Sequence, residues 1–223
     1  MDVRKLIQGI ADFRETKFAD YKEVFAKLVL GQRPDALFIA CSDSRVAANV
    51  FASTNPGDLF VVRNVGNCIP SCDQHGMSTG DESEAAAIEF SLSNLNVRDI
   101  IVCGHSDCGA IQSLINGREK IPFPNLKSWL RHIENALDMK NLFLIKNPPK
   151  EYHNLISQIN VLLQVENLKT YPIVQERILN GTLKLHSWWF DLKTIGVHYY
   201  DESEQQFVLI DEKHARELLK ELK

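Results

Sequence analysis

The chain has 223 residues, of which 44% are hydrophobic and 24% are charged, and its formal net charge is −4. These values are typical of one globular domain and give no basic surface for nucleic acid. No apolar run approaches the roughly 20 residues that a membrane span needs, and no signal-peptide core follows Met1. Five cysteines, an odd number, favour reduced thiols over a disulfide framework. We therefore expect a cytoplasmic protein without a nucleic-acid or membrane partner.

The first half of the chain alternates helical patterns with short apolar runs. Apolar residues recur at helical spacing from residue 3 to about 30, which predicts an amphipathic N-terminal arm broken near Thr16. We expect this arm to pack on its own domain or on a partner chain. The next predicted elements are strands at 36–40, 59–63 and 99–103, helices at 44–52, 81–96 and 108–115, and a loop at 64–80.

The second half continues with a helical stretch and ends in strands. Residues 119–182 are predicted to be helical with breaks at prolines, followed by strands at 183–192 and 198–210 and a helix at 212–223. Alternating strands and helices imply right-handed crossovers. The predicted fold class is α/β, with a central, mainly parallel sheet flanked by helices. Residues 1–223 are predicted to form one domain, in which 1–30 is the arm.

Metal-binding residue types stand at the ends of two predicted strands. Cys41 follows the strand at 36–40, whereas His105 and Cys108 follow the strand at 99–103. Because the carboxyl ends of parallel strands meet at one edge of a sheet, we expect these side chains to converge. Two thiolates and an imidazole suit Zn²⁺, with a fourth position left open as in catalytic sites. The alternative is that Cys41 is a small core residue, as buried cysteines often are.

Asp43 and Arg45 come directly after Cys41. A carboxylate and a guanidinium at this spacing can form a bidentate pair, which would keep Asp43 ionised and able to accept a hydrogen bond from water at the metal. The alternative is a helix-capping aspartate beside a solvated arginine. Cys68 and Cys72 offer a further pair of thiols in the predicted loop, which could bind a metal or oxidise, although loop thiols without a histidine motif commonly do neither.

Several short blocks resemble the signature blocks of the β-class carbonic anhydrases, in the same order. The blocks are 41–45, 63–67, 87–90, 104–110, 159–161, 164–165 and 186–191. The resemblance implies that Cys41, His105 and Cys108 bind one zinc ion per chain. It implies that Asp43 and Arg45 form an orienting dyad. It also implies a substrate pocket shared between two chains, and the residues that match its lining are Gln32, Phe60, Val65, Phe90 and Gly109.

The activity that the resemblance implies is the reversible hydration of CO₂ to bicarbonate and a proton through a zinc-bound hydroxide. The implied assembly is a homodimer or a homotetramer built from two dimers. Two alternatives stay open. The same zinc site could hydrolyse carbonyl sulfide or carbon disulfide, or the domain could be a non-catalytic zinc-bearing sensor or assembly module. The presence of both Asp43 and Arg45 counts against the second alternative.

Two phenylalanines bear on regulation. Some bacterial members of that class hold bicarbonate at a second site built from an arginine, a tryptophan and a tyrosine, and the aspartate then moves onto the zinc. Here Arg63 is present, but Phe38 and Phe190 occupy the other two positions. Phenylalanine cannot donate a hydrogen bond, and each lost bond in a buried pocket costs roughly 1–3 kcal/mol. We therefore predict an open zinc site in which Asp43 pairs with Arg45.

Overall fold

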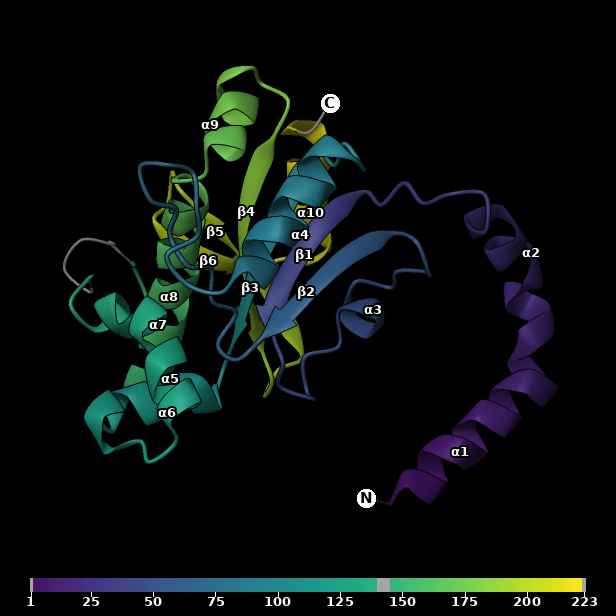
Figure 1. The fold of residues 1–223 in the computed structure, drawn as a ribbon, viewed down its shortest axis with the longest axis horizontal. Helices are drawn as coiled ribbons and strands as arrows, with labels where there is room; N and C mark the ends of the chain where they lie inside the picture. The colour runs from purple at the N-terminus through teal and green to yellow at the C-terminus, as the bar shows by residue number, and fades with distance from the viewer. Residues whose placement is uncertain (1, 140–144, 222–223) are drawn as a thin grey trace.

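The computed structural model describes residues 2–139 and 145–221. Within these residues, six strands form one sheet in the order β2-β1-β3-β4-β5-β6 (Figure 1). The strands are β1 (Ala36–Cys41), β2 (Leu59–Asn64), β3 (Asp99–His105), β4 (Lys184–Asp191), β5 (Gly196–Asp201) and β6 (Gln206–Leu209). The first four pair in parallel, and β5 and β6 are added antiparallel. This mixed sheet flanked by helices confirms the predicted fold class.

The helices largely follow the predicted spans. They are α1 (Val3–Asp12), α2 (Phe18–Leu28), α3 (Ala48–Phe51), α4 (Glu82–Ser93), α5 (Gly109–Ile115), α6 (Pro124–Trp129), α7 (Arg131–Glu134), α8 (Tyr152–Leu168), α9 (Pro172–Leu179) and α10 (Glu212–Glu221). Local chemistry explains several starts. The Asp81 side chain accepts the Ser83 N–H at 2.7 Å and caps α4, and Pro172 opens α9 where no N–H is needed. Among the described helices, none is long and apolar enough to cross a membrane.

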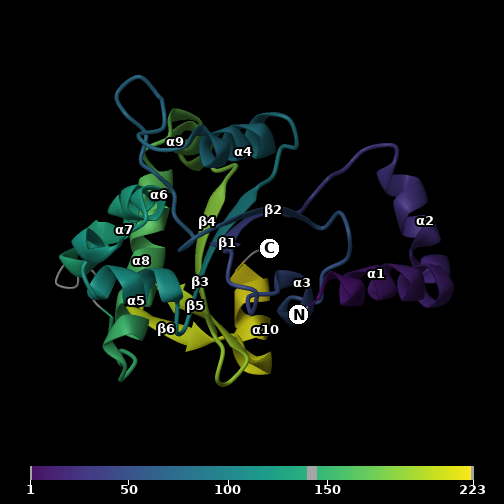
Figure 2. The ribbon, with the colours of Figure 1, turned by 60° about the horizontal axis from the view of Figure 1, so that its bottom comes forward.

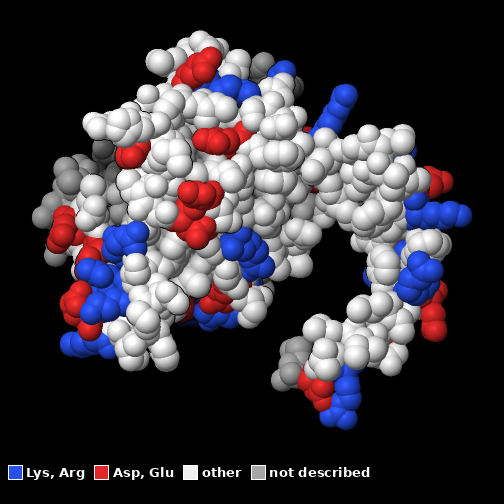
Figure 3. Space-filling view, viewed as in Figure 1, with Lys and Arg blue, Asp and Glu red and all other residues white. Residues whose placement is uncertain are grey.

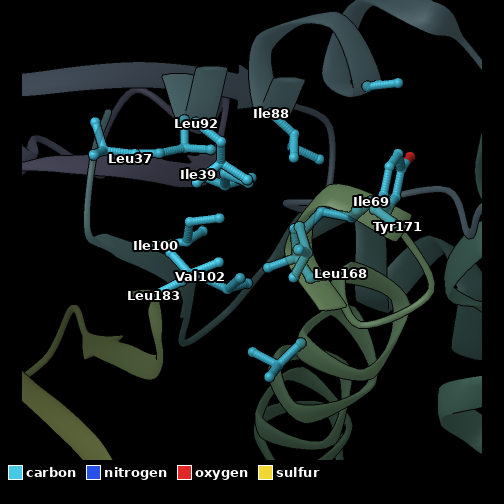
Figure 4. Close-up of a cluster of buried hydrophobic side chains, with 14 of the residues drawn as sticks. Leu37, Ile39, Ile69, Ile88, Leu92, Ile100, Val102, Leu168, Tyr171 and Leu183 are labelled. Carbon is cyan, nitrogen blue, oxygen red and sulfur yellow. The ribbon is translucent and has the colours of Figure 1, made fainter. Parts of the chain in front are cut away.

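The largest hydrophobic cluster lies between the sheet and helices α4, α8 and α9 (Figure 4). All six residues of β1 are buried, as expected for a central parallel strand covered on both faces. Leu37 and Ile39 point into this cluster, whereas Phe38 packs on the opposite face against Phe51 of α3. The central strands are thus fixed on both sides, and they carry the residues at their carboxyl ends in a defined position.

The N-terminal arm stands apart from the rest of the chain in both ribbon views (Figures 1 and 2). The predicted break near Thr16 is a π-helical turn (Phe13–Lys17) that joins α1 to α2. No residue of α1 or α2 is buried, and the apolar Ile10 and Phe25 are 67% and 48% exposed. The structure therefore does not show the arm packed on its own domain, which was the first of the two expected arrangements.

Two predicted elements were wrong in extent. The helix predicted at 44–52 is only α3, because the residues before it form a turn in which the Val46 N–H bonds the Asp43 carbonyl at 3.0 Å. The strand predicted at 198–210 is the β5–β6 hairpin. The Asp201 carboxylate accepts the Ser203 and Glu204 N–H groups at 2.9 and 3.0 Å, which turns the chain. Residues 222–223 of the predicted last helix lie outside the described residues.

The charged side chains of both signs are mixed on the face that Figure 3 shows, over the body and along the arm. This agrees with the net charge of −4. A face of this kind is typical of solvated surface rather than of a nucleic-acid interface.

Candidate metal centre

Cys41, His105 and Cys108 come together at one edge of the sheet. β1 and β3 pair in parallel, with Ala40 opposite Cys103, so both strands end at the same edge. The ligand atoms of the three side chains all lie within 4.8 Å of one another, and all three residues are buried. The two sulfur atoms are 4.0 Å apart. This group could hold a metal ion.

The His105 ring is oriented for a metal ion. Its Nδ1 lies 2.8 Å from the Ser106 carbonyl oxygen, which can only accept, so Nδ1 carries the hydrogen and donates it. Nε2 is then an acceptor, and it is buried without a hydrogen-bond partner. A buried polar atom without a partner is costly. Metal-binding histidines are commonly fixed by such a bond from the other ring nitrogen, so the free lone pair fits a cation.

The sulfur atoms of Cys41 and Cys108 are in hydrogen-bond contact, and this contact shifts the pKa values of the two thiols in opposite directions. The contact with the Cys108 sulfur lowers the pKa of Cys41 below the ordinary value for a thiol. The same contact, together with burial, raises the pKa of Cys108. The Gly66 N–H adds a bond to the Cys41 sulfur at 3.4 Å. These contacts favour the thiolate form of Cys41, and a divalent cation would displace a proton that remains on the pair.

Asp43 and Arg45 form a bidentate ion pair beside this cluster. Arg45 Nε and Nη2 donate to the two carboxylate oxygens at 2.9 and 2.7 Å. This contact holds the pKa of Asp43 well below its usual range. One carboxylate oxygen lies 4.0 Å from His105 Nε2, so the charge faces the ligand atoms. The helix-capping alternative is wrong, because α3 begins after Ala47 and has no side-chain cap.

Arg63 hydrogen-bonds to the backbone of the segment that carries Cys41 and Asp43. Its Nη2 donates to the carbonyl oxygens of Cys41 and Asp43 at 2.9 and 2.7 Å, and its Nε donates to the Cys41 carbonyl at 3.1 Å. It also lines a pocket of about 290 Å³ together with Phe38. The sequence indicates Arg63 only as a possible anion ligand, because this backbone contact depends on the parallel pairing of β1 with β2.

The loop after β2 is held by helices from later in the chain. Trp129 Nε1 donates to the Val65 carbonyl at 2.7 Å, and Asn160 Nδ2 donates to the Gly66 carbonyl at 3.0 Å. These bonds fix the segment whose Gly66 N–H reaches the Cys41 sulfur. Neither Trp129 nor Asn160 was named as a site residue from the sequence. Asn160 falls within one of the resembling blocks, and that was its only signal.

The five residues expected to line the substrate pocket do not come together in one chain. Gly109 follows Cys108 directly, and Val65 precedes the Gly66 amide that contacts Cys41. Phe60 lies opposite Leu37, whereas Cys41 lies opposite Asn64. Four residue steps along the strand therefore separate the level of Phe60 from that of Cys41, a distance of roughly 13 Å.

The two other residues expected to line the substrate pocket, Phe90 and Gln32, also lie away from the carboxyl end of β1, where Cys41 stands. Phe90 of α4 stacks on Phe60, with ring centroids 5.8 Å apart. Gln32 precedes β1 and lines a polar groove with Asp99, the first residue of β3. One chain therefore carries two separate groups of the expected pocket residues.

The other three cysteines stay outside the cluster of ligand atoms. All five cysteines are described and all are free thiols. Burial raises the pKa of Cys68 and of Cys72 above the ordinary value, and it raises that of Cys103 to about 12. Because the thiolate is the reactive form, the raised pKa values do not favour a metal-binding or redox role for these three thiols.

Comparison with known proteins agrees with this geometry. The family model described as "Carbonic anhydrase" matches residues 36–197, which include every strand up to the start of β5. The chain belongs to the β-class carbonic anhydrases. A carbonic anhydrase of Synechocystis sp. is 39% identical over 212 residues, covering 92% of this chain and 74% of the relative. One from Pseudomonas aeruginosa is 35% identical, covering 94% of this chain and 93% of the relative.

Solved structures give the same family. The structure of the β-carbonic anhydrase CcaA superposes with a TM-score of 0.82 at 36% identity, covering 92% of this chain and 98% of that one. One of two tetrameric β-carbonic anhydrases from Sordaria macrospora gives a TM-score of 0.75 at 27% identity, covering 88% and 95%. At 35–39% identity over most of its length to named carbonic anhydrases, this chain is an enzyme of that class.

Proposed function

We propose that the chain catalyses the reversible hydration of CO₂ to bicarbonate and a proton, using one zinc ion held by Cys41, His105 and Cys108. The observation that carries this proposal is the buried, unpartnered His105 Nε2 beside two thiols. When bound there, zinc would lower the pKa of a water molecule from 15.7 to roughly 7 and so supply a nucleophile at neutral pH. A stopped-flow CO₂ hydration assay combined with metal analysis tests the proposal directly.

Asp43 and Arg45 supply the orientation in this proposal. Because Arg45 keeps Asp43 ionised, the carboxylate accepts a hydrogen bond from the nucleophile and turns its lone pair toward the carbon of CO₂. Arg45 is itself fixed, since its Nη2 also donates to the Asp107 carbonyl at 3.1 Å. The two thiolates give the site more negative charge than histidines would, so we expect activity to rise toward alkaline pH.

The substrate pocket is proposed to form between two copies of the chain. Val65 and Gly109 would come from the copy that holds the metal, and Gln32, Phe60 and Phe90 from the other. This division is supported by the separation of the two groups within one chain. The aromatic rings would give nonpolar CO₂ an apolar bed, and the Gln32 amide could donate to a bicarbonate oxygen. The proposed assembly is a homodimer or a dimer of dimers.

The N-terminal arm provides a test of this assembly. Deleting residues 1–28 should produce aggregation or an inactive monomer. The apolar face of the arm is exposed within its own chain, so in the proposed dimer it covers apolar surface of the partner. The deletion would leave that partner surface exposed to water. Size-exclusion chromatography with light scattering, together with the hydration assay, measures both effects. A soluble, active monomer would contradict the proposed dimer.

We expect no cooperative inhibition by bicarbonate. Phe38 lines the pocket beside Arg63 and belongs to one hydrophobic cluster with Phe190, and neither ring can donate a hydrogen bond. The Arg63 guanidinium already donates to the Cys41 and Asp43 carbonyls. Hydration rates should follow a single ionisation with pH and should fall hyperbolically with added bicarbonate. A sigmoidal loss of activity at neutral pH would contradict this. So would a crystal structure with an Asp43 oxygen on the metal at about 2.0–2.2 Å.

The two alternative functions are separated by the same assay. Hydrolysis of carbonyl sulfide or carbon disulfide would need the same metal and acid, so slow CO₂ turnover with fast turnover of either sulfur compound would favour it. A sensor or assembly module would hold zinc without turnover, and the ordered Asp43–Arg45 pair disfavours it. The proposed location is the cytoplasm, which suits five free thiols.

A further inference from the structure

Asp107, between the second and third proposed ligands, has a backbone conformation that few residues adopt. Its φ is +54°, in the left-handed region that residues other than glycine rarely adopt. Because φ at this residue sets the direction in which the chain leaves His105, it also sets where the Cys108 sulfur lies. A right-handed Asp107 would send Cys108 away from Cys41.

The N–H, the carbonyl and the carboxylate of Asp107 each have a hydrogen-bond partner in this conformation. Its N–H donates to Asn154 Oδ1 at 2.8 Å, and its carbonyl accepts Arg45 Nη2 at 3.1 Å. Its carboxylate accepts the His153 Nε2 hydrogen at 2.9 Å. Asn154 is 7% exposed, so its bond is shielded from water, whereas the Asp107 side chain is 50% exposed.

One helical turn further along α8, Ser157 holds the backbone of His105. Ser157 Oγ donates to the His105 carbonyl at 2.7 Å, and Trp189 Nε1 donates to that hydroxyl at 3.2 Å. Asn154 and Ser157 are three apart and so lie on one face of the helix. This face of α8 therefore contacts the backbone at both ends of the segment from His105 to Asp107.

We propose that Asn154 is a positioning residue, which sets the geometry of the His105 and Cys108 ligands by holding Asp107 left-handed. The inference rests on the proposed metal site and adds to it a determinant of metal affinity outside the ligands. By fixing the backbone of Asp107, the bond from its N–H to Asn154 also fixes the Asp107 carbonyl, which accepts a hydrogen bond from the Arg45 guanidinium. Loss of the Asn154 acceptor lets the turn relax in the metal-free protein, and metal binding must then restore it.

The test compares zinc affinity in the full chain, measured by competition with a chromophoric chelator. Asn154→Ala should weaken Zn²⁺ binding by about 10- to 100-fold, the usual effect of losing a residue that orients metal ligands. Asn154→Asp keeps an acceptor oxygen and should restore most of the affinity. The visible spectrum of the Co²⁺-loaded protein reports ligand geometry, and it should change in Asn154→Ala and recover in Asn154→Asp.

Asn167→Ala is the matched control. Asn167 lies near the other end of α8 and donates to the Ile69 carbonyl at 2.8 Å, away from the turn. Its loss should lower thermal stability while zinc affinity and the Co²⁺ spectrum stay as in the wild type. Equal weakening in Asn167→Ala, or wild-type affinity and spectrum in Asn154→Ala, would overturn the inference.

A second pair of variants decides the matter if Asn154→Ala does not fold. Asp107→Gly and Asp107→Ala remove the same carboxylate at a half-exposed position, but only glycine accepts a positive φ without strain. We expect Asp107→Ala to bind zinc about 10-fold more weakly than Asp107→Gly. Equal affinities would overturn the inference. A wild-type chain that takes up no zinc would overturn the metal site itself, and this inference with it.

Discussion

Replacing Cys108 by serine is expected to remove most of the metal and all measurable hydration activity. Cys108 provides one of the two sulfur atoms of the cluster, 4.0 Å from the other. A hydroxyl is a far weaker ligand for zinc than a thiolate, so the remaining ligands, Cys41 and His105, would hold the ion poorly. Zinc per chain, measured by atomic emission, and stopped-flow CO₂ hydration give the two readouts.

Replacing a cysteine outside the metal-ligand cluster by serine is the control for the general effect of a cysteine-to-serine change. Cys72 is only partly buried and does not belong to the ligand group. Cys72→Ser should therefore keep the wild-type zinc content and turnover. Full zinc occupancy with normal turnover in Cys108→Ser would rule out the proposed metal site. Equal losses in both variants would instead indicate general damage to the fold.

The convergence of the three ligand residues could be predicted because it depends on the simplest feature of the fold. β1 and β3 are apolar runs that end where Cys41 and His105 stand, and parallel strands bring such ends to one edge. The Asp43–Arg45 pair was predictable for a similar reason, since the two residues are neighbours in sequence and need no distant contact. The cluster geometry and the ion pair agree with both predictions.

The parts that escaped prediction depend on contacts between distant segments. Asn154 and Asn160 of α8 bond the backbone beside two different ligands, and nothing in their local sequence shows where α8 lies. The β5–β6 hairpin was missed for a local reason. The polar run 201–205 was included in one strand, although Asp201 caps the turn and Gln205 adopts a φ of +54°.

Asp43→Asn is expected to lower turnover by about 10²- to 10⁴-fold, the usual range for a well-placed proton acceptor, while zinc stays bound. An amide carries no charge, so it pairs weakly with Arg45 and orients the nucleophile poorly. The Arg45 contact depresses the Asp43 pKa in the folded state. The stabilisation that this adds is therefore complete above the unfolded pKa of about 3.9 and is lost only as pH falls below it.

Asp43 is thus ionised throughout the neutral and alkaline range, and the loss of turnover in Asp43→Asn should be similar at pH values of about 7 and 9. Asp211→Asn is the matched control, because Asp211 also pairs with a nitrogen base, His214 at 2.8 Å, but lies between β6 and α10 and outside the proposed site. That variant should keep wild-type turnover at both pH values. Lower thermal stability with unchanged turnover per zinc in Asp43→Asn would show that the pair with Arg45 only holds the loop together.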